Sequence, residues 1–212
     1  MKSRLLAAAI AMTAPLAAHA GDSGLELAFR TGFALPLGDV GGVSGSPPAS
    51  LSDSFHAFLP LGVEAGYRFT PNVYAGLVFD YAFGFPNNCP SGASCSGHDV
   101  GLGFDVRYHT LPGEPVDPWF GIGAGYEWLS LAQTQGGSSA DAGANGFEFV
   151  HVDFGADFLT SPNLRLGSFL QFKLGQYRTV DGSSGGSSFS TEIPNKALHE
   201  FLTVGFRISF LL

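Results

Sequence analysis

The sequence has no long apolar run beyond its first twenty residues. A transmembrane helix needs about 18 or more consecutive, predominantly apolar residues, and no stretch within residues 21–212 reaches that length. The sequence therefore excludes a helical membrane span in this part of the chain.

Charge is also scarce, and positive charge most of all. Only 13% of the residues are charged, about half of the share that a soluble domain carries, and 10 Lys and Arg stand against 18 Asp and Glu. No cluster of basic residues occurs, so we expect no nucleic acid or other polyanion as a partner. Hydrophobic residues nevertheless make up 45% of the chain and include 20 Phe. So many aromatic side chains with so few charges require an apolar environment.

The first twenty residues have the pattern of a cleaved export signal. Lys2 and Arg4 form a short basic region, residues 5–18 are mostly apolar, and Ala18 and Ala20 supply small side chains at the cleavage point. This pattern predicts a signal peptide over residues 1–20, followed by one exported domain over residues 21–212.

The chain has only two cysteines, Cys89 and Cys95, in a segment rich in Asn, Ser, Gly and Pro. An exported chain passes through an oxidising compartment, which favours a disulfide between two cysteines so close in sequence. A metal site would need two more ligands nearby, and only His98 is close. We therefore predict a disulfide in a loop.

Large apolar residues alternate with small or charged residues along nearly the whole domain. Strict alternation of this kind predicts β-strands. It occurs in residues 25–35, 59–69, 73–84, 99–109, 120–128, 150–158, 165–175 and 202–210. These segments predict an all-β fold of about eight strands, several of them long enough to cross a membrane at a tilt.

The connections between these segments alternate in length. Short ones lie at residues 70–72, 111–117 and 160–163, and long ones at 36–56, 85–98, 132–146 and 179–196. Short turns at one end and long loops at the other are typical of outer-membrane barrels. The pattern predicts a single up-and-down antiparallel transmembrane β-barrel.

Side-chain volume indicates which face points outward. An eight-stranded barrel has an interior just wide enough for ordinary side chains, and the apolar set, rich in Phe and Tyr, would overfill it. A soluble barrel with this set inside would also expose the glycine-rich face to water. We therefore expect the apolar set to face lipid. Trp119 and Trp128 would lie near the two membrane interfaces, about 23 Å apart, although their opposite parity turns one partly inward.

The lumen-facing parity collects charges of both signs in nearly equal number. Its members are Glu26, Arg30, Glu64, Arg68, Asp80, Asp105, Arg107, Glu127, Asp153, Asp157, Arg165, Lys173 and Arg207. Buried charges are tolerable only when they are paired. Seven acids and six bases therefore predict a structural ion-pair network that plugs the lumen, and the alternative is a narrow, slightly acid-biased conduction path.

The last predicted strand carries a familiar pattern. Residues 203–210 place a polar residue, a glycine, a hydrophobic residue and an aromatic residue at the spacing of the terminal assembly signal of outer-membrane barrels: Thr203, Gly205, Ile208 and Phe210. Residues 30–38 and 119–126 also resemble strands of such proteins. Over residues 21–212 the chain resembles the OmpA/OmpX-like small outer-membrane β-barrel proteins. It departs from their pattern in Leu211 and Leu212, which follow the aromatic residue.

This resemblance implies a location in the bacterial outer membrane, contact with its lipid and lipopolysaccharide, and insertion by the barrel-assembly machinery. We expect a monomeric scaffold or surface protein that serves membrane integrity, adhesion or surface interaction, with a possible extracellular ligand at its long loops. We expect no cofactor and no enzyme activity.

Some similar barrels modify the acyl chains of lipid A, which is the alternative function. One such group carries a His-x-Ser pair on a strand, and this chain has none. Another group uses loop residues, for which His56, Asp99 and loop serines are the candidates here. We expect the lumen-parity histidines, His109, His151 and His199, to be members of the charged network.

Overall fold

The computed structural model describes residues 23–42 and 48–212, so the expected signal peptide lies outside the described residues. The long strands are β1 (Gly24–Gly41), β3 (Phe55–Thr70), β4 (Val73–Pro86), β5 (Ala93–His109), β6 (Val116–Gln135), β7 (Ser138–Ser161), β8 (Leu164–Ser184) and β10 (His199–Leu211). The short elements are β2 (Ala49–Ser50), helix α1 (Leu51–Ser54) and β9 (Ser187–Glu192). In this part of the chain, no helix is both long and apolar enough to cross a membrane.

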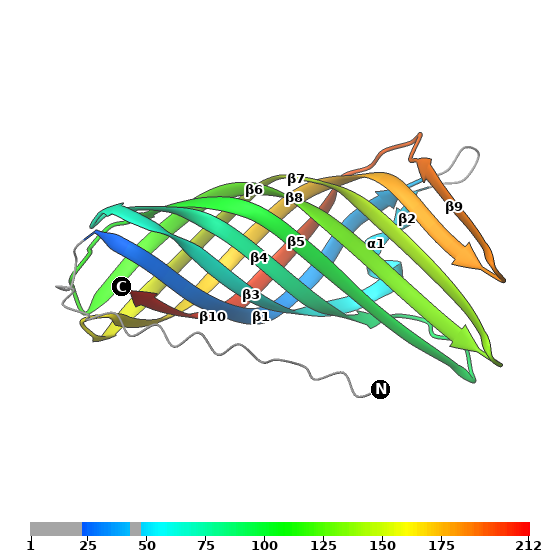
Figure 1. Cartoon of the computed structure of the whole chain (residues 1–212), viewed down its shortest axis with the longest axis horizontal. Helices are drawn as coiled ribbons and strands as arrows, with labels where there is room; N and C mark the ends of the chain where they lie inside the picture. Colours follow the sequence, from blue (N-terminus) through cyan, green and yellow to red (C-terminus); the bar gives the residue numbers. More distant parts are fainter. Residues whose placement is uncertain (1–22, 43–47) are drawn as a thin grey trace, which may run out of the picture.

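The eight long strands form a closed ring of antiparallel neighbours (Figure 1). Each long strand pairs with the next along the chain, and β10 pairs with both β8 and β1. The closing seam runs from the pair Glu26–Leu211 to the pair Gly38–His199. Closure gives every long strand two hydrogen-bonded neighbours, which a sheet in lipid requires. The predicted single up-and-down barrel of about eight strands is confirmed.

The two faces of the wall differ as expected. On the outward parity, Phe29 and Phe104 are both 54% exposed and Phe206 is 72% exposed. On the inward parity, Glu64 and Asp105 are each only 1% exposed. The apolar side chains therefore coat the outside of the barrel, and the charged side chains line the lumen.

Two of the four predicted long loops are strands instead. β6 and β7 continue past the ring into a hairpin that turns at Gly136–Gly137, and β8 and β9 form a second hairpin that turns at Gly185–Gly186 (Figure 1). These four glycines have φ between 57° and 85°, which suits two-residue hairpin turns of the primed type. The alternation signal is lost here because the residues around both turns, 134–142 and 184–192, are exposed on both faces.

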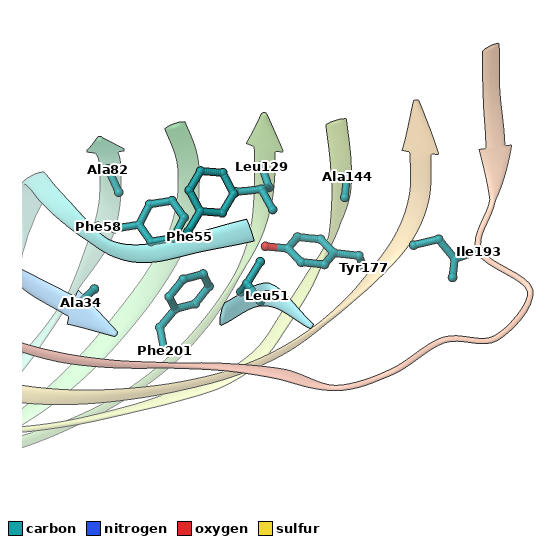
Figure 2. Packing of buried hydrophobic residues seen from close by; sticks show 10 residues of the cluster. All are labelled: Ala34, Leu51, Phe55, Phe58, Ala82, Leu129, Ala144, Tyr177, Ile193 and Phe201. Atoms are coloured by element: carbon teal, nitrogen blue, oxygen red, sulfur yellow. The ribbon is translucent and has the colours of Figure 1, made fainter. Parts of the chain in front are cut away.

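A cluster of buried apolar residues occupies the lumen at the loop end of the barrel (Figure 2). Its members are Ala34, Leu51, Phe55, Phe58, Ala82, Leu129, Ala144, Tyr177, Ile193 and Phe201. We call it the mouth cluster. Helix α1 supplies Leu51, which is fully buried, and the Phe58 ring lies 4.7 Å from that of Phe55 and 5.5 Å from that of Phe201. Part of a predicted long loop therefore folds into the mouth of the barrel.

A positive charge on the outer wall tests this assignment of the two faces. An Arg on the lipid face near the bilayer midplane costs roughly 2–4 kcal/mol. Phe104→Arg should therefore strongly reduce the fraction of chains that fold into lipid vesicles, measured by circular dichroism and protease resistance. Phe189 is the matched control, because it is 60% exposed in β9, outside the ring, and Phe189→Arg should fold like the wild type. Equal folding of both variants would contradict the assignment.

Candidate functional site: the charged lumen

Long charged side chains cross the lumen and meet their partners on other strands. The thirteen residues predicted for the network are all inward, and twelve of them are at most 8% exposed. The side chain of the thirteenth, Lys173, is 12% exposed. The contacts among them fall into three groups along the barrel.

The first group lies at the end of the barrel where β1 begins and β10 ends. Arg68 donates to Glu26 Oε2 from Nε at 2.9 Å and from a terminal nitrogen at 2.6 Å. Arg207 donates to the other oxygen of the same carboxylate at 2.5 Å. His109 lies 3.1 Å from Arg68 and 2.8 Å from Asp117 Oδ2. One carboxylate thus joins two guanidinium groups, which pairs three charges that are at most 3% exposed.

The second group centres on Glu64. Its carboxylate accepts hydrogen bonds from Arg107 at 3.1 and 3.2 Å and from Arg207 at 3.0 Å. Arg207 also donates to Asp157 at 2.9 Å. Trp119 donates from Nε1 to Asp157 at 3.0 Å, and the Arg107 guanidinium lies 4.4 Å from the centre of its ring. Trp119 is therefore a lumen residue and not part of an interfacial belt.

The third group links β1, β4, β7 and β8. Arg30 binds Asp80 through two hydrogen bonds of 3.0 and 2.5 Å. Lys173 lies 3.8 Å from Asp80 and 3.1 Å from Glu148. A side chain at Gly62 would collide with both Arg30 and Asp80. The glycine therefore leaves the space in which this ion pair forms.

Three buried acids were absent from the predicted network: Asp99, Asp117 and Glu148. Asp117 belongs to a predicted turn, and Asp99 is one of the loop candidates for the alternative enzyme. Glu148 has the wrong parity for the lumen, but a bulge at Phe149 shifts the register of β7 and turns Glu148 inward. In the described residues, ten buried acids thus face six bases, so the predicted near-balance of charge is wrong.

The geometry does not assemble the loop residues of the alternative enzyme. His56 is exposed, whereas Asp99 is buried in the lumen at 7% exposure. His98 stacks on Tyr81 with ring centres 5.4 Å apart. Within residues 23–42 and 48–212, no hydrogen bond joins a serine hydroxyl to a histidine. A Ser–His pair, the basis of one hydrolytic mechanism, is thus not formed by these residues.

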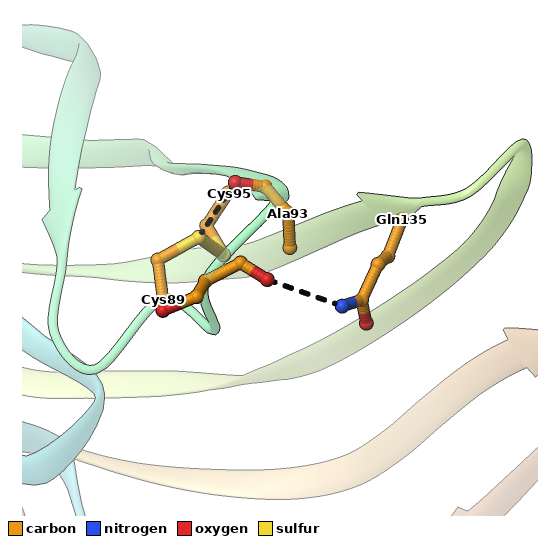
Figure 3. Close-up of a disulfide and its surroundings, with 5 residues drawn as sticks. Cys89, Ala93, Cys95 and Gln135 are labelled. Carbon is orange, nitrogen blue, oxygen red and sulfur yellow. Dashed lines mark hydrogen bonds between the residues drawn. A yellow bond between two sulfur atoms is a disulfide. The ribbon is translucent and has the colours of Figure 1, made fainter.

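A disulfide joins Cys89, in the connection between β4 and β5, to Cys95 near the start of β5 (Figure 3), with their Cα atoms 5.8 Å apart. The side-chain amide of Gln135 donates to the carbonyl of Ser91 at 3.3 Å. This bond ties the disulfide loop to the tip of the β6–β7 hairpin. The disulfide therefore belongs to the loop end and lies outside the lumen.

The residues of the assembly pattern alternate along β10. Thr203 and Gly205 face the lumen, and Ile208 and Phe210 have the opposite parity. A side chain at Gly205 would meet the Phe169 ring at 2.8 Å, so the glycine has a packing role in the lumen as well. Leu211, which departs from the usual pattern, is 4% exposed and pairs with Glu26.

Comparison with solved structures places this geometry among known folds. No protein-family profile matches the sequence, and no curated protein sequence is similar to it. A major outer membrane protein from Thermus thermophilus is similar in structure, with a TM-score of 0.56, 16% identity, and coverage of 89% of this chain and 99% of that chain. OprG from Pseudomonas aeruginosa has a TM-score of 0.55, 14% identity, and coverage of 91% and 99%.

Neisserial surface protein A is also similar in structure, with a TM-score of 0.50 and 16% identity. The match covers 90% of this chain and 99% of that chain. The chain has the fold of the small bacterial outer-membrane β-barrel proteins. The expected resemblance to this group is thus confirmed at the level of the fold. The apolar outer wall agrees with it, since outer-membrane barrels present an apolar band to lipid.

Replacing Arg207, whose guanidinium group is shared by three carboxylates, tests the ion-pair network. Arg207 contacts Glu26, Glu64 and Asp157, and breaking a buried pair by removing one partner costs about 3–5 kcal/mol. Arg207→Met should therefore lower the free energy of unfolding by about that amount in urea titrations of the vesicle-bound barrel. Arg178→Met is the control, since Arg178 is exposed and only stacks on Phe147, a contact worth about 1 kcal/mol or less. An equal decrease in the free energy of unfolding in both variants would argue against a network.

Thiol chemistry tests the disulfide. Neither Cys89 nor Cys95 should react with a maleimide in the folded protein without reductant, and labelling of both would contradict the bridge. The bridge closes a short loop outside the barrel wall, so we expect it to raise the free energy of unfolding by less than about 3 kcal/mol. We expect the double variant Cys89→Ser/Cys95→Ser to fold into vesicles, with faster proteolysis confined to the β4–β5 loop.

Proposed function

We propose that the protein is a non-conducting scaffold and surface protein of the bacterial outer membrane, with a lumen plugged by its own side chains. The observation that carries this proposal is that buried ion pairs and buried apolar rings both occupy the lumen. Three groups of ion pairs lie within it, and the mouth cluster lies at its loop end. An enzyme would need a site that a substrate can reach, and a pore would need a continuous water path.

The space left between the ion pairs and the mouth cluster supports a closed lumen. A cavity of about 30 Å³ lies there, lined by residues that include Arg30, Asp80, Phe58 and Phe201. A volume of this size holds about one or two water molecules. An ion on its way through would have to separate the Arg30–Asp80 pair and then displace the apolar rings. Both steps oppose conduction.

The hairpins beyond the ring support a surface role. The β6–β7 and β8–β9 hairpins present mostly Ser, Gly and Ala to water, and Phe189 is 60% exposed on the second. We propose that this loop end makes the contacts with an extracellular ligand, and that the lipid-facing wall contacts lipid and lipopolysaccharide. The barrel would act as a monomer, because its eight-stranded ring is complete in one chain.

We further propose that the outward residues Ile208 and Phe210, together with Thr203 and Gly205, direct insertion by the barrel-assembly machinery. In support, β10 is the strand that closes the ring against β1. A strand that pairs last would remain accessible until insertion is complete.

Single-channel recording tests the closed lumen. The wild type in a planar bilayer should give no stepwise current, and Phe55→Ala/Phe58→Ala, which empties part of the mouth cluster, should give rare openings. Phe79→Ala, a change on the lipid face, should stay silent like the wild type. Steady current through the wild type would contradict the proposal and favour a narrow pore.

A deletion strain separates the scaffold from the enzyme. Loss of the gene should leave the acylation pattern of lipid A unchanged while the envelope becomes more permeable or less adhesive. A changed acylation pattern that the wild-type gene restores would contradict the scaffold and favour an acyl-modifying enzyme.

A further inference from the structure

Three buried metal-ligating side chains meet in the lumen beside the Glu64 group, and one of them, Asp105, also accepts a hydrogen bond through Oδ2 from Arg107 at 2.6 Å. Asp105 comes from β5, and His151 and Asp153 come from β7; they are 1%, 2% and 1% exposed. His151 Nε2 lies 3.8 Å from Asp105 Oδ1 and 3.9 Å from Asp153 Oδ2. One ligand atom from each of the three lies within 4.8 Å of the others. We call these residues the lumen triad.

Two glycines in the strand between them let the triad form. Gly123 of β6 pairs with Asp105 on one side and with His151 on the other, and Gly121 pairs with Asp153. A side chain at Gly123 would collide with the His151 ring, and a Cβ at Gly121 would lie 2.9 Å from Asp105 Oδ1. Side chains from β5 and β7 therefore reach across β6 and face one another.

The atoms that face into the triad have no hydrogen-bond partner. Asp105 Oδ1, His151 Nε2 and both carboxylate oxygens of Asp153 are all buried without one in the described part of the chain. Buried polar atoms are normally satisfied, and leaving them unpaired is costly. Because one ligand atom from each of the three residues lies within 4.8 Å of the others, we infer that something binds between them.

The other ring nitrogen of His151, Nδ1, has the hydrogen-bond partner that metal-binding histidines usually have. Glu148 accepts a hydrogen bond from His151 Nδ1, and its other oxygen lies 3.1 Å from Lys173 Nζ. A proton on Nδ1 leaves the lone pair of Nε2 free to coordinate. A carboxylate that holds the far nitrogen of a metal-binding histidine is a recurring feature of metal sites.

Charge favours a cation at the same place. The described lumen holds ten buried acids against six Arg and Lys, and Asp153 has no Arg or Lys within ion-pairing distance in the described structure. A divalent cation between Asp105 and Asp153 would reduce this excess. Tetrahedral zinc, with ligand bonds of about 2.0–2.2 Å, places its ligands about 3.3–3.6 Å apart. The distances from His151 Nε2 to the two carboxylates are 3.8 and 3.9 Å, so the side chains would move slightly inward around the ion.

We propose that Asp105, His151 and Asp153 bind one divalent transition-metal cation of the zinc class. The mixture of one imidazole and two carboxylates suits zinc better than it suits calcium or magnesium, which take oxygen ligands. The ion cross-links β5 and β7 through the lumen, so it is structural. Because the lumen is packed, the ion enters as the barrel folds.

Zinc content of the refolded barrel tests the proposal. The mature chain, without an added histidine tag, is folded into lipid vesicles with ZnCl₂, dialysed to remove free zinc and measured by mass spectrometry. We expect about one zinc ion per barrel. His151→Gln and Asp153→Asn should lower zinc affinity roughly tenfold or more, and Glu148→Gln, which removes only the positioning carboxylate, should lower it about 10–100-fold.

Two other lumen histidines provide matched controls. His109 and His199 are as buried as His151, and each pairs with one carboxylate, Asp117 and Glu127 respectively. His109→Gln and His199→Gln should retain zinc. Zinc loss in these variants equal to that in His151→Gln would overturn the assignment.

The wild type provides a measurement that does not depend on how the variants fold. X-ray absorption at the zinc edge should show one imidazole nitrogen and otherwise oxygen ligands. Several imidazoles or a sulfur ligand would overturn the proposal. Absence of zinc after refolding would also overturn the proposal. A protonated His151 that bridges the two carboxylates would then account for the triad.

Discussion

The structure depends on the requirement that every backbone polar group in lipid be paired within the chain. The seam between β1 and β10 meets this requirement, since it joins the two ends of the sheet from Glu26–Leu211 to Gly38–His199. An open edge in the same place would leave a row of unpaired amide and carbonyl groups in hydrocarbon, at several kcal/mol for each group. Closure in turn gives the barrel a defined inside and outside.

The diameter of the closed ring decides what the inside can contain. Eight strands leave room for little more than the side chains themselves, and glycine on the strand between two charged residues gives their side chains space to meet. Gly62 makes this space for Arg30 and Asp80, and Gly121 and Gly123 make it for the lumen triad. The glycine content that would weaken a soluble strand is thus what allows ion pairs to cross this lumen.

The lumen is divided along its axis into a charged part and an apolar part. Charges fill it from the end that holds Glu26 and Arg68, and aromatic rings fill it near Phe55 and Phe201. One ion pair also lies at the mouth, where Tyr177 stacks on His199 with ring centres 4.0 Å apart and His199 binds Glu127. The proposed closed state follows from the two parts together, because an ion would meet first fixed charges and then a surface that cannot solvate it.

The sequence by itself determined the strands, the two faces, the closed all-β class and the residues of the charged set. These follow from alternation, which is a local property: a residue's parity sets its side of the wall wherever the strand lies. Tertiary structure alone decided which acid meets which base, because this depends on the stagger of eight strands. It also decided the bulge at Phe149 that turns Glu148 inward, and the fold of Leu51 into the mouth. Both features depend on contacts between segments far apart in the chain, and no local pattern carries that information.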